Sequence, residues 1–174
     1  MKKIISLALL CSASLGLAEL PKFVVGAGVS NFHQSEAGID INIPVGYVSA
    51  GCEVALPNND QFVIVPELRL GTGITSDDVY TQGYTVDTEI TQFYSLNLRA
   101  QYEFTEKAYI FGNVAYTYSE AEASLYGYAA SADSWDLGAG AGIGYNITEQ
   151  VSAEVNAEFY DGTTLMGGAV RFTF

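Results

Sequence analysis

One segment of the chain brings together residue types that could cleave an ester. The only histidine, His33, lies two residues before Ser35 and three before Glu36. A serine becomes a nucleophile when a base such as histidine lies within hydrogen-bonding reach. Here the residues are close neighbours in a polar connecting segment, where side chains seldom face one another productively. We therefore interpret the segment as exposed surface and expect no catalytic residue, no cofactor and no metal site.

Charged residues of both signs form a second candidate site. They occupy alternate positions in segments whose other positions are apolar, and acids outnumber bases. If these side chains face an interior of low dielectric, they must form ion pairs or hydrogen bonds. We predict a charge network that plugs this interior; the alternative is a narrow conduit that favours cations. The set comprises Glu53, Glu67, Arg69, Arg99, Glu103, Asp136, Glu154, Glu158 and Arg171.

A third group combines acidic residues with tyrosines in the connections between the regular segments. Tyrosine interleaved with small polar residues suits protein recognition. Acidic side chains would favour basic partners, or divalent cations that bridge to lipopolysaccharide phosphates. These connections are candidate binding loops for an extracellular protein; the alternative is a surface that the charges only keep soluble and repulsive. Their residues are Asp77, Asp78, Tyr80, Tyr84, Asp87, Tyr126 and Tyr128.

The elements that must position these residues are strands. Strict alternation of apolar and polar residues predicts a strand with two different faces. The four cleanest segments, residues 62–71, 94–104, 135–147 and 151–160, are close to the 9–11 residues that a tilted transmembrane strand needs. Eight strands are enough to close a barrel without free edges. The predicted strands are residues 23–32, 39–56, 62–71, 94–104, 108–119, 135–147, 151–160 and 166–174.

Residues 39–56 break the alternation. Apolar residues hold odd positions up to Val45 but even positions from Ala50 onward. A β-bulge between Val45 and Ala50 would shift the phase, and Pro44 supports an irregularity there because proline cannot donate to the ladder.

Glycine occupies every second position from Gly138 to Gly144. The run lacks the G-x-G-x-x-G spacing and opens no helix, so it does not indicate a phosphate-binding loop. We interpret these glycines as lumen positions emptied for bulky neighbours, or as packing positions on the lipid side.

The connections differ in length in an alternating way. Residues 57–60, 105–107 and 148–150 are short polar turns, whereas residues 31–38, 76–88 and 120–133 are longer, and 161–163 is again short. Outer-membrane barrels have short periplasmic turns and longer extracellular loops.

The composition indicates which face of the strands is outside. A soluble barrel would carry many lysines on its exterior, but after residue 18 only Lys22 and Lys107 remain. The polar face is rich in glycine and carries both signs of charge, as a narrow lumen requires. Aromatic residues gather near strand ends, as in the girdles at the two membrane interfaces. We therefore place the apolar face in lipid; a soluble lipocalin-like barrel is the alternative.

The N-terminus has the pattern of a secretory signal. Lys2 and Lys3 precede a short apolar run, and small residues end at Ala18. We predict that residues 1–18 are cleaved and that residues 19–174 form one barrel domain. The mature chain would then hold 5 basic and 20 acidic residues, a net charge of −15. Such a charge excludes nucleic acid as a partner.

The signal, the eight amphipathic strands, the unequal connections and the ending Val170-Arg171-Phe172-Thr173-Phe174 together resemble the small OmpA/OmpX/opacity-type outer-membrane proteins. The resemblance covers the whole mature chain. It implies an eight-stranded antiparallel up-and-down transmembrane β-barrel in the outer membrane of a Gram-negative bacterium. It also implies contact with outer-membrane lipid and lipopolysaccharide, a monomeric state, and Phe172 and Phe174 as the signal read by the barrel assembly machinery.

The resemblance is less specific for activity. It favours a structural or surface-binding role of the adhesin or opacity type, with a plugged lumen. A narrow porin that passes small solutes or cations is the alternative. A lipid A-modifying barrel enzyme that uses His33 and Ser35 is a third hypothesis, although related lipases carry their histidine–serine pair late in the chain.

Overall fold

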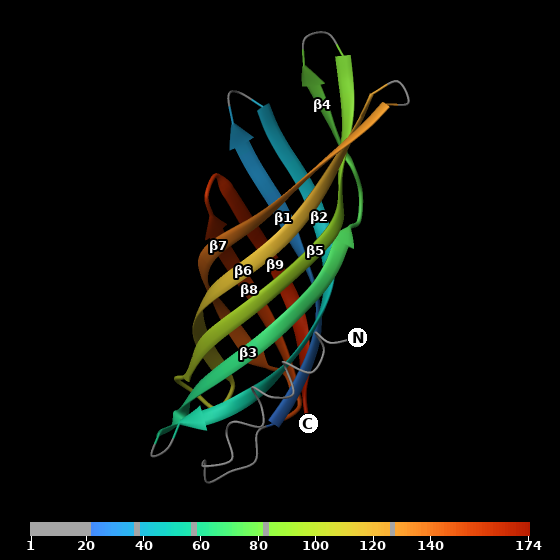
Figure 1. Cartoon of the computed structure of the whole chain (residues 1–174). Helices are drawn as coiled ribbons and strands as arrows, with labels where there is room; N and C mark the ends of the chain where they lie inside the picture. The colour runs from blue at the N-terminus through green and yellow to red at the C-terminus, as the bar shows by residue number, and fades with distance from the viewer. Residues whose placement is uncertain (1–21, 37–38, 57–58, 82–83, 126–127) are drawn as a thin grey trace, which may run out of the picture.

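The computed structural model describes residues 22–36, 39–56, 59–81, 84–125 and 128–174 as an antiparallel barrel (Figure 1). Its strands alternate in direction around the ring, and no helix in these ranges is long and apolar enough to cross a membrane. The strands of the described residues are β1 Lys22–Glu36, β2 Ile39–Leu56, β3 Asn59–Gly73, β4 Asp77–Thr81, β5 Tyr84–Glu103, β6 Ala108–Leu125, β7 Tyr128–Asn146, β8 Val151–Tyr160 and β9 Thr163–Thr173.

Two pairings close the ring. β1 pairs with β9 from Val24↔Thr173 to Gln34↔Thr163, and β3 pairs with β5 from Phe62↔Tyr102 to Gly71↔Phe93. β4 is not part of the ring, because it pairs only with the first residues of β5. Eight strands therefore form the closed wall, and the predicted fold class is confirmed.

Side chains alternate across this wall as the sequence predicts. In β5, Leu96 and Leu98 are 53% and 52% exposed, whereas Asn97 and Arg99 are 5% and 1% exposed. The apolar side chains point outward and the polar ones point into the lumen. In water this arrangement would expose a broad apolar belt, whereas in a bilayer it buries that belt in lipid.

The predicted bulge between Val45 and Ala50 is wrong. β2 pairs with β1 without interruption from Ile39 to Glu53. Ile43, Val45 and Tyr47 all face inward and are buried. The strand keeps its phase while its faces exchange character, because the interior is apolar near the outer end of the barrel. The register shifts in β2 and β5 lie elsewhere, at Ala55/Leu56 and at Ile90/Gln92.

An apolar layer therefore fills the outer part of the lumen. Its rings include Tyr47 and Phe93, with centroids 6.4 Å apart. The layer comprises Ile43, Val45, Tyr47, Ile90, Phe93 and Leu165, with Phe32, Ile41, Tyr160 and Ala169 packed against it.

At the opposite, periplasmic end, the connections between β5 and β6 and between β7 and β8 are tight. The Thr105 hydroxyl accepts a hydrogen bond from the Ala108 backbone N–H at 2.9 Å, and Thr148 does the same for Val151 at 2.9 Å. A threonine side chain thus closes each turn by bonding the backbone ahead of it. At the outer end, the turn between β8 and β9 holds Gly162 at φ 74°, a conformation that favours glycine.

Much of the sequence expected in long outer connections continues the strands instead. β1 runs to Glu36, β4 and β5 form a hairpin, and β6 and β7 pair out to Leu125↔Tyr128. In Figure 1 the ends of β4, β5, β6 and β7 rise beyond the outer ends of β8 and β9. We call the part beyond the ring the outer sheet: β4 with residues 84–92 of β5, 120–125 of β6 and 128–138 of β7.

Candidate functional site

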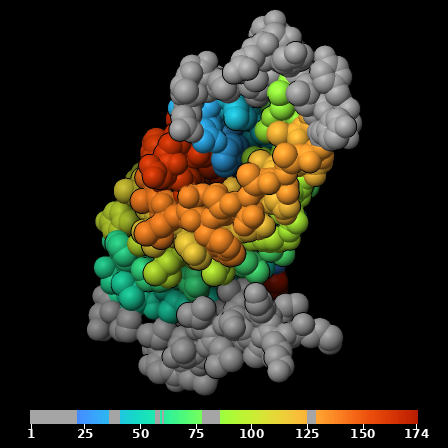
Figure 2. Space-filling model, turned by 45° about the horizontal axis from the view of Figure 1, so that its top comes forward, coloured from blue at the N-terminus to red at the C-terminus, as the bar shows by residue number. Residues whose placement is uncertain are grey.

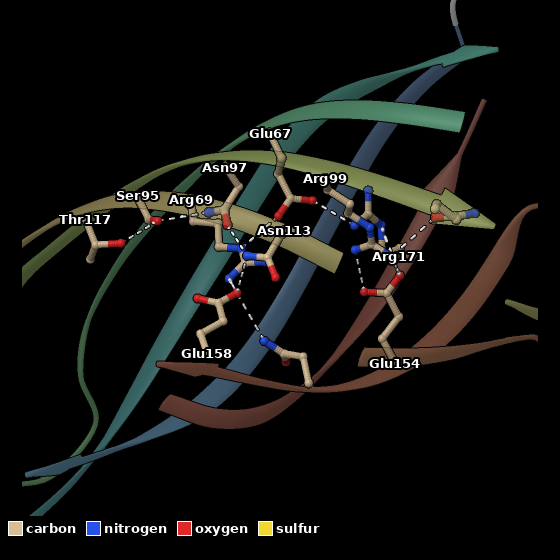
Figure 3. Close-up of polar contacts among 12 residues, drawn as sticks. Glu67, Arg69, Ser95, Asn97, Arg99, Asn113, Thr117, Glu154, Glu158 and Arg171 are labelled. Atoms are coloured by element: carbon tan, nitrogen blue, oxygen red, sulfur yellow. Dashed lines mark hydrogen bonds and ion pairs between the residues drawn. The ribbon is translucent and has the colours of Figure 1, made fainter. Parts of the chain in front are cut away.

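Glu158 is the centre of the outer half of the lumen network (Figure 3). Its Oε1 accepts hydrogen bonds from Arg69 Nη1 at 2.7 Å and from Asn113 Nδ2 at 3.0 Å. Its Oε2 accepts a hydrogen bond from the Tyr160 hydroxyl at 2.9 Å. Glu158 is fully buried. A buried carboxylate is stable only when charge partners and hydrogen bonds replace water, and Glu158 has both.

Glu154 is the centre of the periplasmic half of the network. Arg99 binds both of its oxygens through Nη1 and Nη2, with Nη1 to Oε2 at 2.8 Å, and the Tyr109 hydroxyl donates to Oε1 at 2.6 Å. The Arg99 guanidinium also lies over the Phe111 ring, 3.6 Å from its centroid. Two-pronged binding of a carboxylate is the strongest geometry that arginine offers.

Glu67 joins the two halves. One of its oxygens forms an ion pair with Arg69 Nε at 2.7 Å, and the other forms an ion pair with Arg171 Nη1 at 2.8 Å. Arg171 reaches toward Glu154, at 3.7 Å. The connected core thus holds three arginines and three glutamates, so its formal charge is balanced.

A chain of neutral groups extends this core toward the outer end. Asn113 donates to Asn97 at 2.8 Å, Asn97 donates to Ser95 at 2.9 Å, and the Ser95 and Thr117 hydroxyls lie 2.7 Å apart. Thr117 meets the Tyr160 hydroxyl at 3.0 Å. Sequence reasoning did not place these residues in the network, although their inward positions between charged residues were a usable signal.

The glycines of β7 make room for the bulky members of this interior. A Cβ on Gly142 or Gly144 would collide with the rings of Phe111 and Tyr109, which lie directly over them. On Gly138 it would collide with the Tyr160 ring. Gly138, Gly142 and Gly144 therefore leave space for aromatic rings on adjacent strands, whereas Gly140 leaves space for Glu158 and Asn113.

Three residues of the predicted charge set lie away from this core. Glu53 and Glu103 line a cavity of about 370 Å³ at the periplasmic mouth, together with Tyr109 and Ser152. Asp136 lies at the outer rim, where Ser134 donates to it at 2.6 Å. These three acidic residues, by which the acids outnumber the arginines, therefore lie at the two ends of the lumen and not along its centre.

The acidic residues and tyrosines expected in loops lie on strands. The Asp77 carboxylate accepts the Asn42 backbone N–H at 2.7 Å, which ties β4 to β2. The backbone pairs include Asp78↔Asp87, Tyr80↔Thr85, Thr81↔Tyr84 and Leu125↔Tyr128. Tyr126 lies outside the described residues.

His33 does not bind Ser35. Its Nδ1 lies 2.9 Å from Asn42 Oδ1 on the neighbouring strand, and Asn31 donates to the same oxygen at 3.2 Å. Within the described residues, no hydrogen bond joins His33 to Ser35, and no group of three or more His, Cys, Asp or Glu is placed to hold a metal ion.

An aromatic cluster lies on the outward face where the outer sheet begins. Tyr116 and Trp135 stack with centroids 4.8 Å apart, Tyr118 and Trp135 lie 5.1 Å apart, and Tyr94 and Tyr118 stack at 5.7 Å. Exposed leucines lie on the periplasmic side of the cluster, at Leu96 and Leu137. Aromatic side chains between an apolar belt and a polar surface mark a membrane interface.

The C-terminal aromatics lie at the closing seam. Phe174 and Phe23 exchange both backbone hydrogen bonds at 2.9 Å, and their rings stack with centroids 6.3 Å apart. Phe172 lies on the same outward face, 5.9 Å from Phe174. Both phenylalanines are exposed.

A closed barrel with an apolar exterior, an ion-paired interior and an aromatic cluster at the edge of its apolar belt defines an integral outer-membrane protein. The profile of the outer membrane protein beta-barrel domain matches residues 4–173. The chain belongs to this family, and it is located in the outer membrane. No curated protein matches the sequence significantly.

Solved structures with the same fold share little sequence with this chain. Ail, the attachment invasion locus protein of Yersinia pestis, has a TM-score of 0.60 at 16% identity, over 87% of this chain and 99% of its own; it was solved with the heparin analogue sucrose octasulfate. Neisserial surface protein A has a TM-score of 0.58 at 16% identity, over 87% and 97%. The N-terminal barrel of Pseudomonas aeruginosa OprF has 0.53 at 14%, over 86% and 97%.

Proposed function

We propose that this barrel is a surface-binding protein of the adhesin or opacity type. The observation that carries the proposal is the outer sheet, which continues three wall strands beyond the closed ring and adds β4. A wall that only spans the membrane has no use for such an extension. The extension instead offers a rigid, solvent-exposed surface on which loops and strand faces can meet a partner.

The charge of this surface favours a basic partner. The outer sheet carries Asp87, Glu89, Glu120, Glu122 and Asp133. The described lysines, Lys22 and Lys107, lie at the periplasmic end, and the three arginines are buried in the lumen. The polyanion seen on Ail is therefore not the ligand class that we propose for this chain.

A shortened outer hairpin tests the role. Glu120 pairs directly with Asp133, so replacing residues 121–132 by Asn-Gly joins β6 to β7 by a two-residue turn in register. Cells that display the native barrel should bind a basic matrix protein, and cells that display the shortened one should lose that binding while the barrel stays heat-modifiable on SDS gels. As a matched control, the β1–β2 hairpin is shortened between Phe32 and Ile43, which are also paired. Equal binding by the native barrel and by the barrel with the shortened β6–β7 hairpin would contradict the proposal.

We propose that the lumen is sealed and that the protein is not a porin. The balanced core of arginines and glutamates and the apolar layer above it support this proposal. Reproducible single-channel steps from the purified barrel in a planar bilayer would contradict it.

We also propose that the protein is not an enzyme. The contact of His33 with Asn42, in place of Ser35, supports this view. Deletion of the gene should leave the lipid A mass spectrum unchanged, and a shifted acylation pattern would restore the hydrolase hypothesis.

The remaining partners follow from the same surfaces. We propose that lipopolysaccharide contacts the aromatic cluster and that divalent cations link its phosphates to the acidic outward face. Removal of divalent cations with EDTA should then release lipopolysaccharide from the purified monomer. We propose that the barrel assembly machinery reads the C-terminal strand, and that residues 1–18 are removed on export.

A further inference from the structure

The longest unpaired strand edge of the described residues lies on β7. β6 pairs with β7 over its whole length, from Leu125↔Tyr128 to Ala108↔Tyr145. β8 pairs with β7 only from Ala139↔Phe159 inward, because β8 ends at Tyr160. Residues 129–137 of β7 therefore have a neighbouring strand on one side only. Trp135 belongs to the aromatic cluster at the membrane interface and Leu137 to the apolar belt, so we call the stretch beyond them, residues 129–134, the β7 edge.

The β7 edge is open to solvent. Every residue from Ala129 to Trp135 is exposed, whichever face it occupies. Figure 2 shows β7, in orange, uncovered across the near side of the molecule. On such an edge every second residue directs its backbone N–H and C=O outward without a partner strand.

Another free edge in the outer part is filled, which makes the β7 edge distinctive. Residues 39–44 of β2 have no β3 partner. Their edge is filled, because the Asn42 N–H donates to Asp77 and the Pro44 carbonyl accepts the Ile74 N–H at 2.7 Å. On β7, pairing with β6 is uninterrupted, and residues 129–137 contain no proline, no lysine and no bulge. These are the usual devices that stop an edge from accepting another strand.

The charges beside the β7 edge select the occupant. Two acidic pairs lie directly opposite one another across the strands of the outer sheet: Glu89↔Glu122 and Glu120↔Asp133. Like charges in this position repel. A second copy of this chain would add more negative charge, whereas a strand bearing lysine or arginine would relieve the repulsion.

We propose that the β7 edge binds an extended basic segment of an extracellular protein as an added β-strand. Main-chain hydrogen bonds to the edge supply affinity, and basic side chains opposite Asp133 supply selectivity. The inference rests on the proposed surface-binding function and names its mode and partner class. The edge spans roughly 20 Å at about 3.3 Å per residue, so a segment of about six residues would cover it.

Hydrogen exchange on the full barrel in lipid nanodiscs tests the proposal. The probe is a peptide of about ten residues that alternates lysine with valine, since this pattern favours a strand with one charged face. Two control peptides of equal length alternate glutamate with valine, and lysine with proline. The first reverses the charge; the second keeps the charge but removes half of the donors and cannot form a ladder.

The lysine–valine peptide should slow exchange of the outward-pointing amides of the β7 edge by about tenfold or more, while neither control does so. The Asp133→Asn variant should weaken this protection without altering exchange in the barrel wall. Absence of protection on the β7 edge overturns the proposal, as does equal protection by the glutamate–valine peptide or by the lysine–proline peptide.

The outcome separates this inference from the proposed function. If the shortened-hairpin experiment shows binding by the outer sheet but the β7 edge gains no protection, the surface-binding role stands and strand addition fails. If the native barrel binds no basic matrix protein but its β7 edge accepts the lysine–valine peptide, the edge has the inferred chemistry and the adhesin role fails.

Discussion

Arg99 lies between an aromatic ring and a carboxylate in the periplasmic half of the lumen. Its guanidinium carbon is 3.6 Å from the Phe111 ring centroid, and its terminal nitrogens bind the Glu154 carboxylate. The Phe111 ring in turn covers the bare backbone of Gly142. Glu154 of β8, Arg99 of β5, Phe111 of β6 and Gly142 of β7 thus form one line of contacts. The glycine run and the charge network are parts of one packed interior.

Replacing Arg99 by methionine should destabilise the barrel by about 3 to 5 kcal/mol, because it leaves Glu154 buried without its main counter-charge. Urea unfolding in detergent measures the loss. Glu103→Gln is the matched control, since Glu103 lines the open periplasmic mouth and its change should stay within about 0.5 kcal/mol. Similar free energies of unfolding for the two variants would mean that water in the lumen compensates for the lost ion pair.

Adding one methyl group at Gly144 should cost about 1 to 3 kcal/mol, because the Tyr109 ring occupies the space that a Cβ needs. Gly112→Ala is the control: the nearest atom to its Cβ would be the Gly140 carbonyl oxygen at 3.7 Å, an ordinary contact. Tyr109→Ala combined with Gly144→Ala should show strong coupling in a double-mutant cycle. Additive effects would show that the tyrosine and the glycine do not constrain each other.

The alternation in β5 was enough to predict its wall strand and both of its faces, because one face of that strand meets lipid and the other meets the charged lumen. The same reasoning failed in β2. Ile43 and Val45 are apolar and inward, since the barrel interior near its outer end is packed like that of a soluble protein. A period of two identifies two faces, but it does not say which face water reaches.

The sequence could not predict which side chains pair within the lumen, for a related reason. Position along a strand indicated that Glu67 and Glu158 face inward, but their joint contact with Arg69 depends on the register of strands far apart in the chain. The outer sheet was missed because small and polar residues such as Ala129 and Ser131 have weak strand preference. Their strand geometry comes from pairing with β6 and not from their own side chains.

Phe174→Ala should separate an assembly signal from a closing contact. The substitution keeps the backbone bonds to Phe23 and removes only the exposed ring. We expect normal refolding in detergent but a clear fall in the heat-modifiable fraction in cells, because the ring is proposed to be read during assembly. Removal of residue 174 altogether should impair both, since the Phe23 N–H and C=O lose their partners. Normal assembly of Phe174→Ala in cells would leave the ring with no role as a signal.

The facing carboxylates of the outer sheet should make its local stability depend on salt. Glu89 lies opposite Glu122, and Glu120 opposite Asp133, with Cβ atoms of such pairs about 5 Å apart. We expect Glu122→Gln to slow amide exchange in the outer parts of β5 and β6, in proportion to a gain of up to about 1 kcal/mol. Raising the ionic strength to about 1 M, where the screening length falls to about 3 Å, should have the same effect on the native protein and a smaller one on the variant. The matched control is Ser124→Ala, which lies opposite Asp87 and removes no charge. If Glu122→Gln and Ser124→Ala change exchange equally, repulsion between the carboxylates does not set the stability of this sheet.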